Sequence, residues 1–357
     1  MAKWRYAVPL PDVCGRSTAP RDLVHVFAPL RPDRYAEPCE FMRNPLVEPM
    51  LLGEHHVREP FLNAVQERVV LGDGAMGTQL IDAGLPVGRS GDEWNLSAPA
   101  KVQSIHAAYV TAGAELLLTN TFQACPIALV RHGLADRAYE INLNAARIAR
   151  DCAGPAGYVL GDVGPFGGFL APLGNTSRSE LEDAFAVQVT GLLDGGVDAI
   201  IIETMTALEE LEVAVGAVRR CRQDVPIIAS MTLDRIADGG FRTMTGVSVA
   251  DAVLFMDHLG VDIFGCNCGT GLHIGDYAQL VGEYRLHTRK PIMVQPNAGQ
   301  PRLDHGRIMY DESPDSMAAG VPALVSAGAN IVGGCCGTTP AHIALFRERL
   351  RRTGGRG

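Results

Sequence analysis

The chain has 357 residues, of which 47% are hydrophobic and 20% charged, and its net charge at pH 7 is -9. This composition excludes intrinsic disorder, which needs low hydrophobicity, and it excludes collagen-like repeats and small disulfide-stapled domains. The acidic balance, without any Lys/Arg cluster beside stacking aromatics, argues against a nucleic-acid partner. We therefore expect a large globular protein.

The sequence contains no apolar run of the roughly 18 residues that cross a bilayer, and its N-terminus does not resemble a signal peptide. Its nine cysteines are odd in number and irregularly spaced. In a reducing compartment such cysteines are free thiols, metal ligands or catalytic groups more often than disulfides. We expect a cytoplasmic protein with no membrane partner, and the sequence leaves homo-oligomerisation open.

Residues 1–60 differ from the rest of the chain, because they contain scattered prolines and no sustained apolar period of 2 or 3.6 residues. Such a segment is typical of a surface arm, an oligomer contact or a partly disordered tail. We predict two parts: an irregular N-terminal extension over 1–60 and a single domain over 61–357.

From Arg68 onward, short β-rich apolar runs alternate with amphipathic stretches of ten or more residues. The eight runs lie at 68–73, 115–120, 158–162, 199–204, 226–231, 262–268, 291–296 and 330–336. Between them, apolar residues repeat at helical spacing, as in Ile274, Tyr277, Val281 and Tyr284. Eight strand-helix units with right-handed crossovers predict an α/β fold, a closed (β/α)8 TIM barrel.

Helix-start signals support this alternation. Ser179 with Glu182 matches a capping box, and Ser313-Pro314 and Thr339-Pro340 each place a capping residue before a proline. The competing fold is an open doubly wound sheet, which usually carries a G-x-G-x-x-G loop after its first strand. The turn GDGAMGT (72–78) lacks that spacing, so the barrel is favoured.

In a barrel, functional side chains lie at the C-terminal ends of the strands. This rule selects Asp73, Asn120, Asp162, Glu203, Thr204, Asn267, Cys268, Asn297, Cys335 and Cys336.

The three cysteines in this set follow the sixth and eighth strands, whose ends lie on one side of the barrel mouth. Three thiolates with an open fourth position are typical of a catalytic zinc site, although buried free cysteines also serve as core fillers. Cys335 and Cys336 can face one ion only if the strand has ended or bulged, and the glycines around them favour such a departure. We place Cys266 in a lower layer, and its participation as a fourth ligand of a structural zinc stays open.

Six segments carry a resemblance to a known family. They are LGDGAMGTQL (71–80), GAELLLTNTF (113–122), VDAIIIET (197–204), GCNCGTG (265–271), PNAGQP (296–301) and IVGGCCGTTPAHI (331–343). Together they resemble the homocysteine S-methyltransferase family over about residues 65–350, and the G-x-N-C and G-G-C-C motifs in that order are highly specific.

The resemblance implies that Cys268, Cys335 and Cys336 bind Zn²⁺, and that Asp73 and Glu203 hold the amino group of homocysteine. We add Gly74, Thr204, Asn267 and Asn297 to the predicted substrate site, because they lie at or next to the strand ends selected above. A free thiol has a pKa near 8.5 and reacts only as the thiolate, which zinc generates by removing the proton. The expected reaction is therefore methyl transfer to the homocysteine thiolate, giving methionine, without a protein nucleophile.

The methyl donor is the open question. A small onium donor, betaine or a sulfonium, favours aromatic faces, and Trp94, Phe122 and Phe166 follow the first three strands. The alternative is a zinc barrel that exchanges methyl groups with a separate corrinoid protein, which an apolar, exposed rim would favour. A zinc hydrolase is disfavoured by the all-sulfur ligand set and by the lack of a positioned histidine base.

Overall fold

The structure is a computed structural model that describes residues 58–353 except 87, 238 and 305–306. These residues belong to the unit of the chain that follows His56. Residues 1–57 of the predicted extension lie outside the described residues, and with them Cys14 and Cys39.

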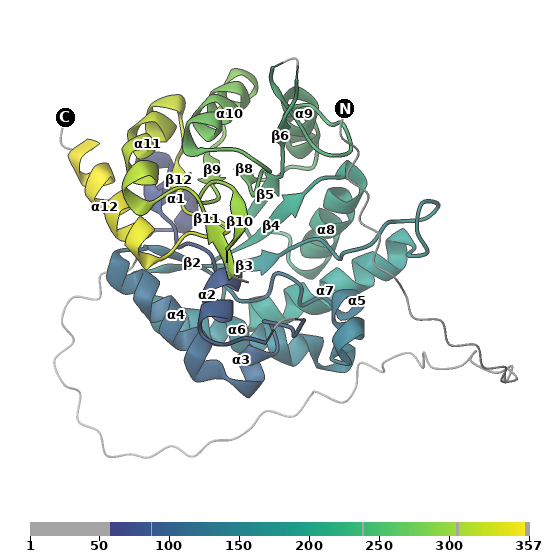
Figure 1. The fold of residues 1–357 in the computed structure, drawn as a ribbon. Helices are drawn as coiled ribbons and strands as arrows, with labels where there is room; N and C mark the ends of the chain where they lie inside the picture. The colour runs from purple at the N-terminus through teal and green to yellow at the C-terminus, as the bar shows by residue number, and fades with distance from the viewer. Residues whose placement is uncertain (1–57, 87, 238, 305–306, 354–357) are drawn as a thin grey trace, which may run out of the picture. The chain divides into compact units, whose positions relative to one another are not determined.

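Eight parallel strands form one sheet in the order β1-β12-β9-β8-β5-β4-β3-β2 (Figure 1). The two end strands are joined by a parallel bridge between Gly72 and Leu116, so the sheet closes on itself. The strands are β1 Val70–Leu71, β2 Leu116–Leu118, β3 Tyr158–Val163, β4 Ala199–Met205, β5 Ile227–Met231, β8 Ile263–Asn267, β9 Ile292–Gln295 and β12 Ile331–Val332. Each predicted run coincides with one of these strands, although β3 and β4 each extend one residue beyond it, and the (β/α)8 barrel is confirmed.

Helices surround the sheet in Figure 1 and connect successive strands. They are α2 Gly77–Asp82, α3 Trp94–Ser97, α4 Pro99–Ala112, α5 Pro126–Leu129, α6 Ala138–Ala153, α7 Arg178–Asp194, α8 Leu208–Cys221, α9 Val249–His258, α10 Ile274–His287, α11 Pro314–Ala327 and α12 Pro340–Thr353. Two 3₁₀ turns, Val130–His132 and Ala135–Arg137, lie between α5 and α6. The predicted apolar stripe of α10 is fully buried, as its 3.6-residue period requires. Within the described part of the chain, no helix is both long enough and apolar enough to cross a membrane.

One predicted helix start is wrong. The capping box of α7 is formed by Ser177 and Glu180, two residues earlier than the predicted pair Ser179 and Glu182. The Ser177 hydroxyl accepts the backbone N–H of Glu180 at 3.2 Å, and the Glu180 carboxylate accepts the N–H of Ser177 at 2.8 Å. The other two starts are as predicted, since α11 and α12 begin at Pro314 and Pro340.

A separate hydrophobic cluster fills the interior of the barrel at its N-terminal end. Helix α1 (Phe61–Glu67) contributes buried residues to this cluster, and the strands contribute alternate residues such as Leu160 and Ile201. Because side chains alternate across a strand, every second residue further along β3 and β4 also faces the interior. The C-terminal part of the interior is therefore where Asp162 and Glu203 lie.

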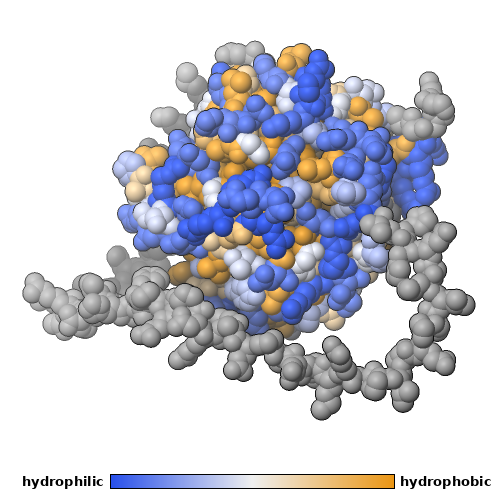
Figure 2. Space-filling model, turned by 180° about the vertical axis from the view of Figure 1, so that it is seen from behind, coloured by the Kyte–Doolittle hydropathy of each residue, from blue (hydrophilic) through white to orange (hydrophobic). Residues whose placement is uncertain are grey.

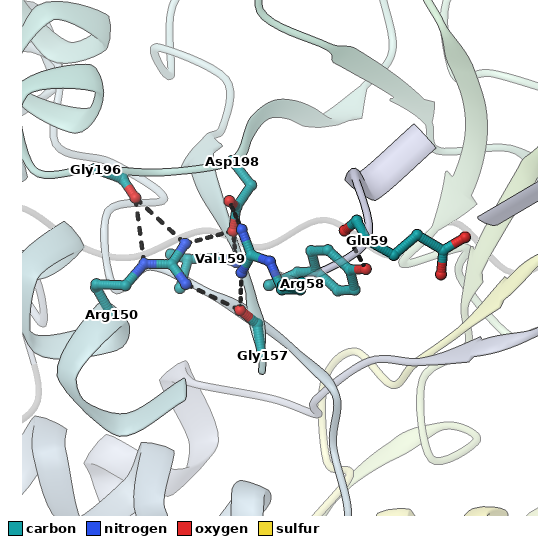
Figure 3. A network of polar contacts seen from close by, with 8 residues as sticks. Arg58, Glu59, Arg150, Gly157, Val159, Gly196 and Asp198 are labelled. Atoms are coloured by element: carbon teal, nitrogen blue, oxygen red, sulfur yellow. Dashed lines mark hydrogen bonds and ion pairs between the residues drawn. The ribbon is translucent and has the colours of Figure 1, made fainter. Parts of the chain in front are cut away.

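A charged network joins the residues at the N-terminal end of β3 and β4 (Figure 3). Asp198 accepts hydrogen bonds from the guanidinium groups of Arg58 and Arg150 and from the backbone N–H of Val159. Both arginines also donate to the carbonyl of Gly157.

Figure 2 shows the molecule from the side opposite to that of Figure 1. This surface is mixed in character, with apolar side chains between hydrophilic ones.

Two hairpins were not predicted from the sequence. The loop after β5 contains β6 (Asp234–Arg235) paired with β7 (Phe241–Arg242), and the loop after β9 contains β10 (Pro301–Asp304) paired with β11 (Arg307–Tyr310). Both hairpins lie at the end of the barrel where the strands finish, because they follow the C-termini of their strands.

Candidate active site

Three thiols meet at the C-terminal mouth of the barrel. The sulfur atoms of Cys268, Cys335 and Cys336 all lie within 4.8 Å of one another. Cys268 directly follows β8, and the two adjacent cysteines follow β12, which already ends at Val332. The departure from strand geometry that the adjacent cysteines need is therefore present.

The spacing of the thiols fits a tetrahedral metal ion. The sulfur of Cys336 is 3.8 Å from that of Cys268 and 4.0 Å from that of Cys335. A zinc ion with Zn–S bonds of about 2.3 Å would place its sulfur ligands roughly 3.8 Å apart. Hydrogen bonds from the Cys268 and Cys335 thiols, together with a smaller effect of Tyr310, lower the pKa of Cys336 to about 3. The cluster thus favours a thiolate even before a cation binds.

Backbone contacts hold the thiols in place. The N–H of Gly269, next to Cys268, donates to the Tyr277 hydroxyl at 2.8 Å. Thr338 donates to the Cys335 carbonyl at 2.7 Å and accepts the N–H of Ala75 at 3.0 Å. The turn after β1 is therefore tied directly to the turn that carries the cysteine pair.

These supporting side chains were not predicted. Tyr109, which is buried on α4, donates to the carbonyls of Ala75 at 2.7 Å and Thr338 at 3.2 Å. Tyr277 belongs to the predicted apolar stripe of α10, which indicated only a place in the core. For Thr338, the one available sequence signal was its position in segment 331–343, which carries the family resemblance. Tyr310 belongs to the unpredicted β10–β11 hairpin, and sequence alone offered no signal for it.

Two buried carboxylates lie beside the thiols. Asp73 is 3% exposed and accepts the N–H of Leu118 at 2.9 Å, whereas Glu203 is 7% exposed and accepts the side-chain amide of Asn267 at 3.2 Å. Burial raises the pKa of Asp73 well above its ordinary value, and the charge of Glu203 raises it further. Burial, and then the charge of Cys336, raises the pKa of Glu203 to about 8. No cation is among the described groups whose charges shift these two pKa values.

Asn267 links the ends of β4, β5 and β8. Its amide donates to the Thr204 hydroxyl at 2.8 Å, and its carbonyl oxygen accepts the N–H of Thr204 at 3.1 Å and the Ser230 hydroxyl at 2.8 Å. Thr204 has a φ of 61° and Cys268 a φ of 58°, values that are uncommon outside glycine and mark strained backbone. The strain is concentrated on the two strand ends that carry Glu203 and Cys268.

The structure also places Gly74 and Asn297 at the mouth. A Cβ on Gly74 would lie 2.7 Å from the Thr338 hydroxyl, so this position leaves no room for a side chain. The amide of Asn297 donates to the carbonyl of Gly269 at 3.2 Å, and its buried Oδ1 has no partner among the described residues.

The three aromatic residues predicted for a donor differ in accessibility. Trp94 is 9% exposed and carries the Lys101 ammonium 4.3 Å from its ring centre, so one face is occupied. Phe166 is 5% exposed, and its N–H donates to the Glu210 carboxylate at 2.8 Å. Phe122 is half-buried and packs against Gly164.

The remaining described cysteines lie apart from the cluster. Cys266 is fully buried in β8, and it is not among the residues whose ligand atoms converge in the described part of the chain. Cys152 and Cys221 lie on helices, and Cys125 caps the N-terminus of α5. A cavity of about 870 Å³ lies at the opposite end of the barrel, among residues that precede strands, including Asp262, Pro291 and Asn330. The C-terminal mouth remains the better candidate, because barrel chemistry is located there.

A closed (β/α)8 barrel with three converging thiols and buried carboxylates at its C-terminal mouth defines a TIM-barrel enzyme with a sulfur-rich centre. Residues 70–350 match the homocysteine S-methyltransferase family. The chain therefore belongs to this family.

Relatives and solved structures agree with this assignment. Methionine synthase of Mycobacterium tuberculosis is 35% identical over 312 residues, covering 82% of this chain and 26% of that protein. The Mycobacterium leprae methionine synthase is 34% identical over 317 residues, again covering 26% of that protein. The chain thus spans about a quarter of the length of these relatives. Homocysteine methyltransferase MmuM from Escherichia coli, in its metallated form, has a TM-score of 0.66 and 26% identity over 82% of this chain and 100% of that one.

Proposed function

We propose that the protein transfers a methyl group from a small onium donor, betaine or a sulfonium, to the thiolate of homocysteine and forms methionine, with Zn²⁺ as cofactor. The observation that carries this proposal is the convergence of three sulfur atoms within 4.8 Å beside two buried carboxylates, on which no cation acts among the described residues. A reducing compartment such as the cytoplasm would keep these thiols free.

Zinc bound by Cys268, Cys335 and Cys336 would supply the charge that removes the proton of the substrate thiol at neutral pH. Asp73 and Glu203 bind the substrate ammonium, which supplies a cation that neither buried carboxylate has among the described residues. Asn267 orients Glu203 through its amide. Gly74, Thr204 and Asn297 shape the pocket through backbone position and hydrogen bonds.

The donor would lie on the side of β2 and β3. Phe122 and Phe166 offer aromatic surface for a dispersed positive charge, and the Glu210 carboxylate beside Phe166 adds a negative charge. Trp94 contributes through the packing of the loop after β1. No protein nucleophile is needed, because the donor carries its methyl on a good leaving group.

Methionine formation from homocysteine tests the proposal. The zinc-loaded protein is offered betaine, S-methylmethionine, S-adenosylmethionine, dimethylsulfoniopropionate and a methyl-corrinoid separately. We expect turnover with at least one onium donor. Absence of methionine with every donor would overturn the assignment of substrate and reaction.

A second candidate is favoured by one observation: large apolar residues are exposed on loops that follow the strands. Phe169 and Leu173 follow β3, Met244 follows β5, and Leu303, Ile308 and Met309 lie on the β10–β11 hairpin, all at least 53% exposed. Such a rim fits a separate corrinoid protein that presents the methyl group. Leu303→Asp should then reduce turnover with a corrinoid protein, whereas turnover with a free small donor should not change.

A further inference from the structure

The barrel mouth holds a third buried carboxylate, Asp162, at the end of β3. Leu160, two residues earlier, belongs to the interior cluster, so Asp162 faces the interior as well. In the sheet, Asp162 pairs with Ile201 of β4. Glu203 follows Ile201 by two residues on the same strand and therefore faces the same side. The charges of Glu203, Asp92 and Asp73 all act on Asp162, so it belongs to the same group of acids.

The backbone of Asp162 is firmly held, whereas its side chain is not. The N–H donates to the Thr119 hydroxyl at 2.9 Å, and the carbonyl accepts the Thr121 hydroxyl at 2.7 Å and the Gln188 amide at 3.2 Å. The residue is only 5% exposed, and its buried Oδ1 has no hydrogen-bond partner among the described residues. The surrounding structure therefore fixes this carboxylate at a position where it makes no compensating bond.

Burying a carboxylate without a partner is costly, and a group of acids increases this cost by mutual repulsion. Burial, and then the charges of Glu203, Asp92 and Asp73, raises the pKa of Asp162 well above its ordinary value. None of the charged groups that act on it in the described part of the chain is a cation. A cationic ligand group beside the free Oδ1 would offset this cost without displacing any hydrogen bond of that oxygen among the described residues.

A substrate ammonium provides three N–H donors, while the proposed function uses two carboxylates. Asp73 and Glu203 each already accept one hydrogen bond from the protein, which fixes their orientation. We infer that Asp162 is the third carboxylate that binds the substrate's ammonium group, and that it sets the preference for an amino-acid thiol over a thiol without an amino group. This inference rests on the proposed function, because it takes homocysteine as the substrate.

Calorimetric titration of the zinc-loaded protein tests this role without a methyl donor. The two ligands are homocysteine and 4-mercaptobutanoate, which has the same thiol and carboxylate but no amino group. Asp162→Asn should weaken homocysteine binding about 10- to 100-fold, the effect of losing a hydrogen bond between charged groups in a buried site. Binding of 4-mercaptobutanoate should change by less than about threefold, because the ammonium contact is absent.

Asp92→Asn is the matched control. Asp92 is a neighbouring buried acid, but its two oxygens accept the Ser90 hydroxyl at 2.9 Å and the Gln123 N–H at 3.2 Å. This variant should keep the preference of the wild type for homocysteine. Asp162→Ser provides a second neutral variant in case Asp162→Asn does not fold.

The outcomes separate the two claims. If the wild-type protein binds neither thiol, the proposed function fails and this inference fails with it. If the wild-type protein binds homocysteine, but neutral variants at position 162 bind it equally well or weaken both thiols alike, only the role of Asp162 is overturned. The role of Asp162 is supported if the Asp162 variants lose the preference for homocysteine over 4-mercaptobutanoate while Asp92→Asn keeps it.

Discussion

Two aspartates at opposite ends of the same pair of strands have contrasting surroundings. Asp198, at the N-terminal end, accepts hydrogen bonds from Arg58, Arg150 and the N–H of Val159. Asp162, at the C-terminal end, is buried with an unpartnered oxygen and with other acids as its charged neighbours. The fold satisfies the first aspartate by itself and leaves the second for a ligand.

This contrast extends to the two ends of the barrel. The N-terminal end is closed by α1, whose apolar residues pack against the strands, and by the arginine network of Figure 3. The C-terminal end combines three thiols, a group of buried acids and two non-glycine residues with positive φ. Stability is thus located at one end and chemistry at the other, as the barrel architecture leads one to expect.

The largest effect is expected from removing a thiol at the mouth. Cys335→Ala should remove bound zinc and abolish methionine formation, a loss greater than the roughly 10- to 100-fold that follows removal of a group supporting a metal ligand. Metal content by mass spectrometry and turnover are measured on the same sample. Cys266→Ala is the control and should retain zinc, because Cys266 lies outside the cluster. An active, zinc-free Cys335→Ala protein would refute the mechanism.

His106 is an exception to the contrast between the two ends of the barrel. It lies on α4, outside the mouth, and is fully buried. Both of its ring nitrogens lack hydrogen-bond partners among the described residues. Burial lowers its pKa from 6.5 to about 4. The unfolded state therefore binds the proton first, so stability should fall by about 3 kcal/mol as the pH drops from 6.5 to 4.

His106→Leu should remove this part of the pH dependence, which urea unfolding at several pH values would measure. Because other groups titrate equally in both proteins, the difference between wild type and variant isolates the histidine. Parallel stability curves for the two proteins would show that His106 is not responsible.

At the N-terminal end, Asp198→Ala should destabilise the protein by about 2 kcal/mol, since it leaves two half-buried guanidinium groups and one N–H without their acceptor. Affinity for homocysteine should stay unchanged, because the network lies far from the mouth. Chemical denaturation and calorimetric titration check the two parts. A variant with normal stability and weakened homocysteine binding would contradict the assignment of stability to the N-terminal end and of ligand binding to the C-terminal end.

The smallest effect is a gain in stability. Because the folded-state pKa of Asp162 is raised, its contribution to stability is present below about pH 4 and is lost as the pH rises toward the folded-state pKa. Asp162→Asn should therefore be more stable than wild type by about 1 kcal/mol at pH 8 and equal to it near pH 4. Denaturant midpoints at both pH values measure this, and a variant that is less stable at pH 8 would contradict it.

Much of the barrel could be predicted because its signals are local. Each strand is a short apolar run and each helix has a 3.6-residue stripe, so the number of units follows from the sequence. The position of the capping box of α7 did not follow, because Ser177 with Glu180 and Ser179 with Glu182 both match the pattern. Only packing distinguishes them.

The site was predictable where position along a strand determines location. Cys268, Cys335 and Cys336 converge because parallel strands end on one face. The roles of Tyr277, Thr338 and Tyr310 were not predictable, because each depends on a contact with another turn. The free oxygen of Asp162 is also a property of its surroundings, which the residue type alone does not reveal.

The positive φ of Cys268 has a consequence for protein engineering. Glycine adopts this backbone conformation without strain, so a search for stabilising substitutions would favour glycine there by roughly 1 kcal/mol. The same exchange would delete a sulfur from the cluster. Selection of variants by heat resistance alone would therefore tend to produce well-folded barrels that have lost their activity.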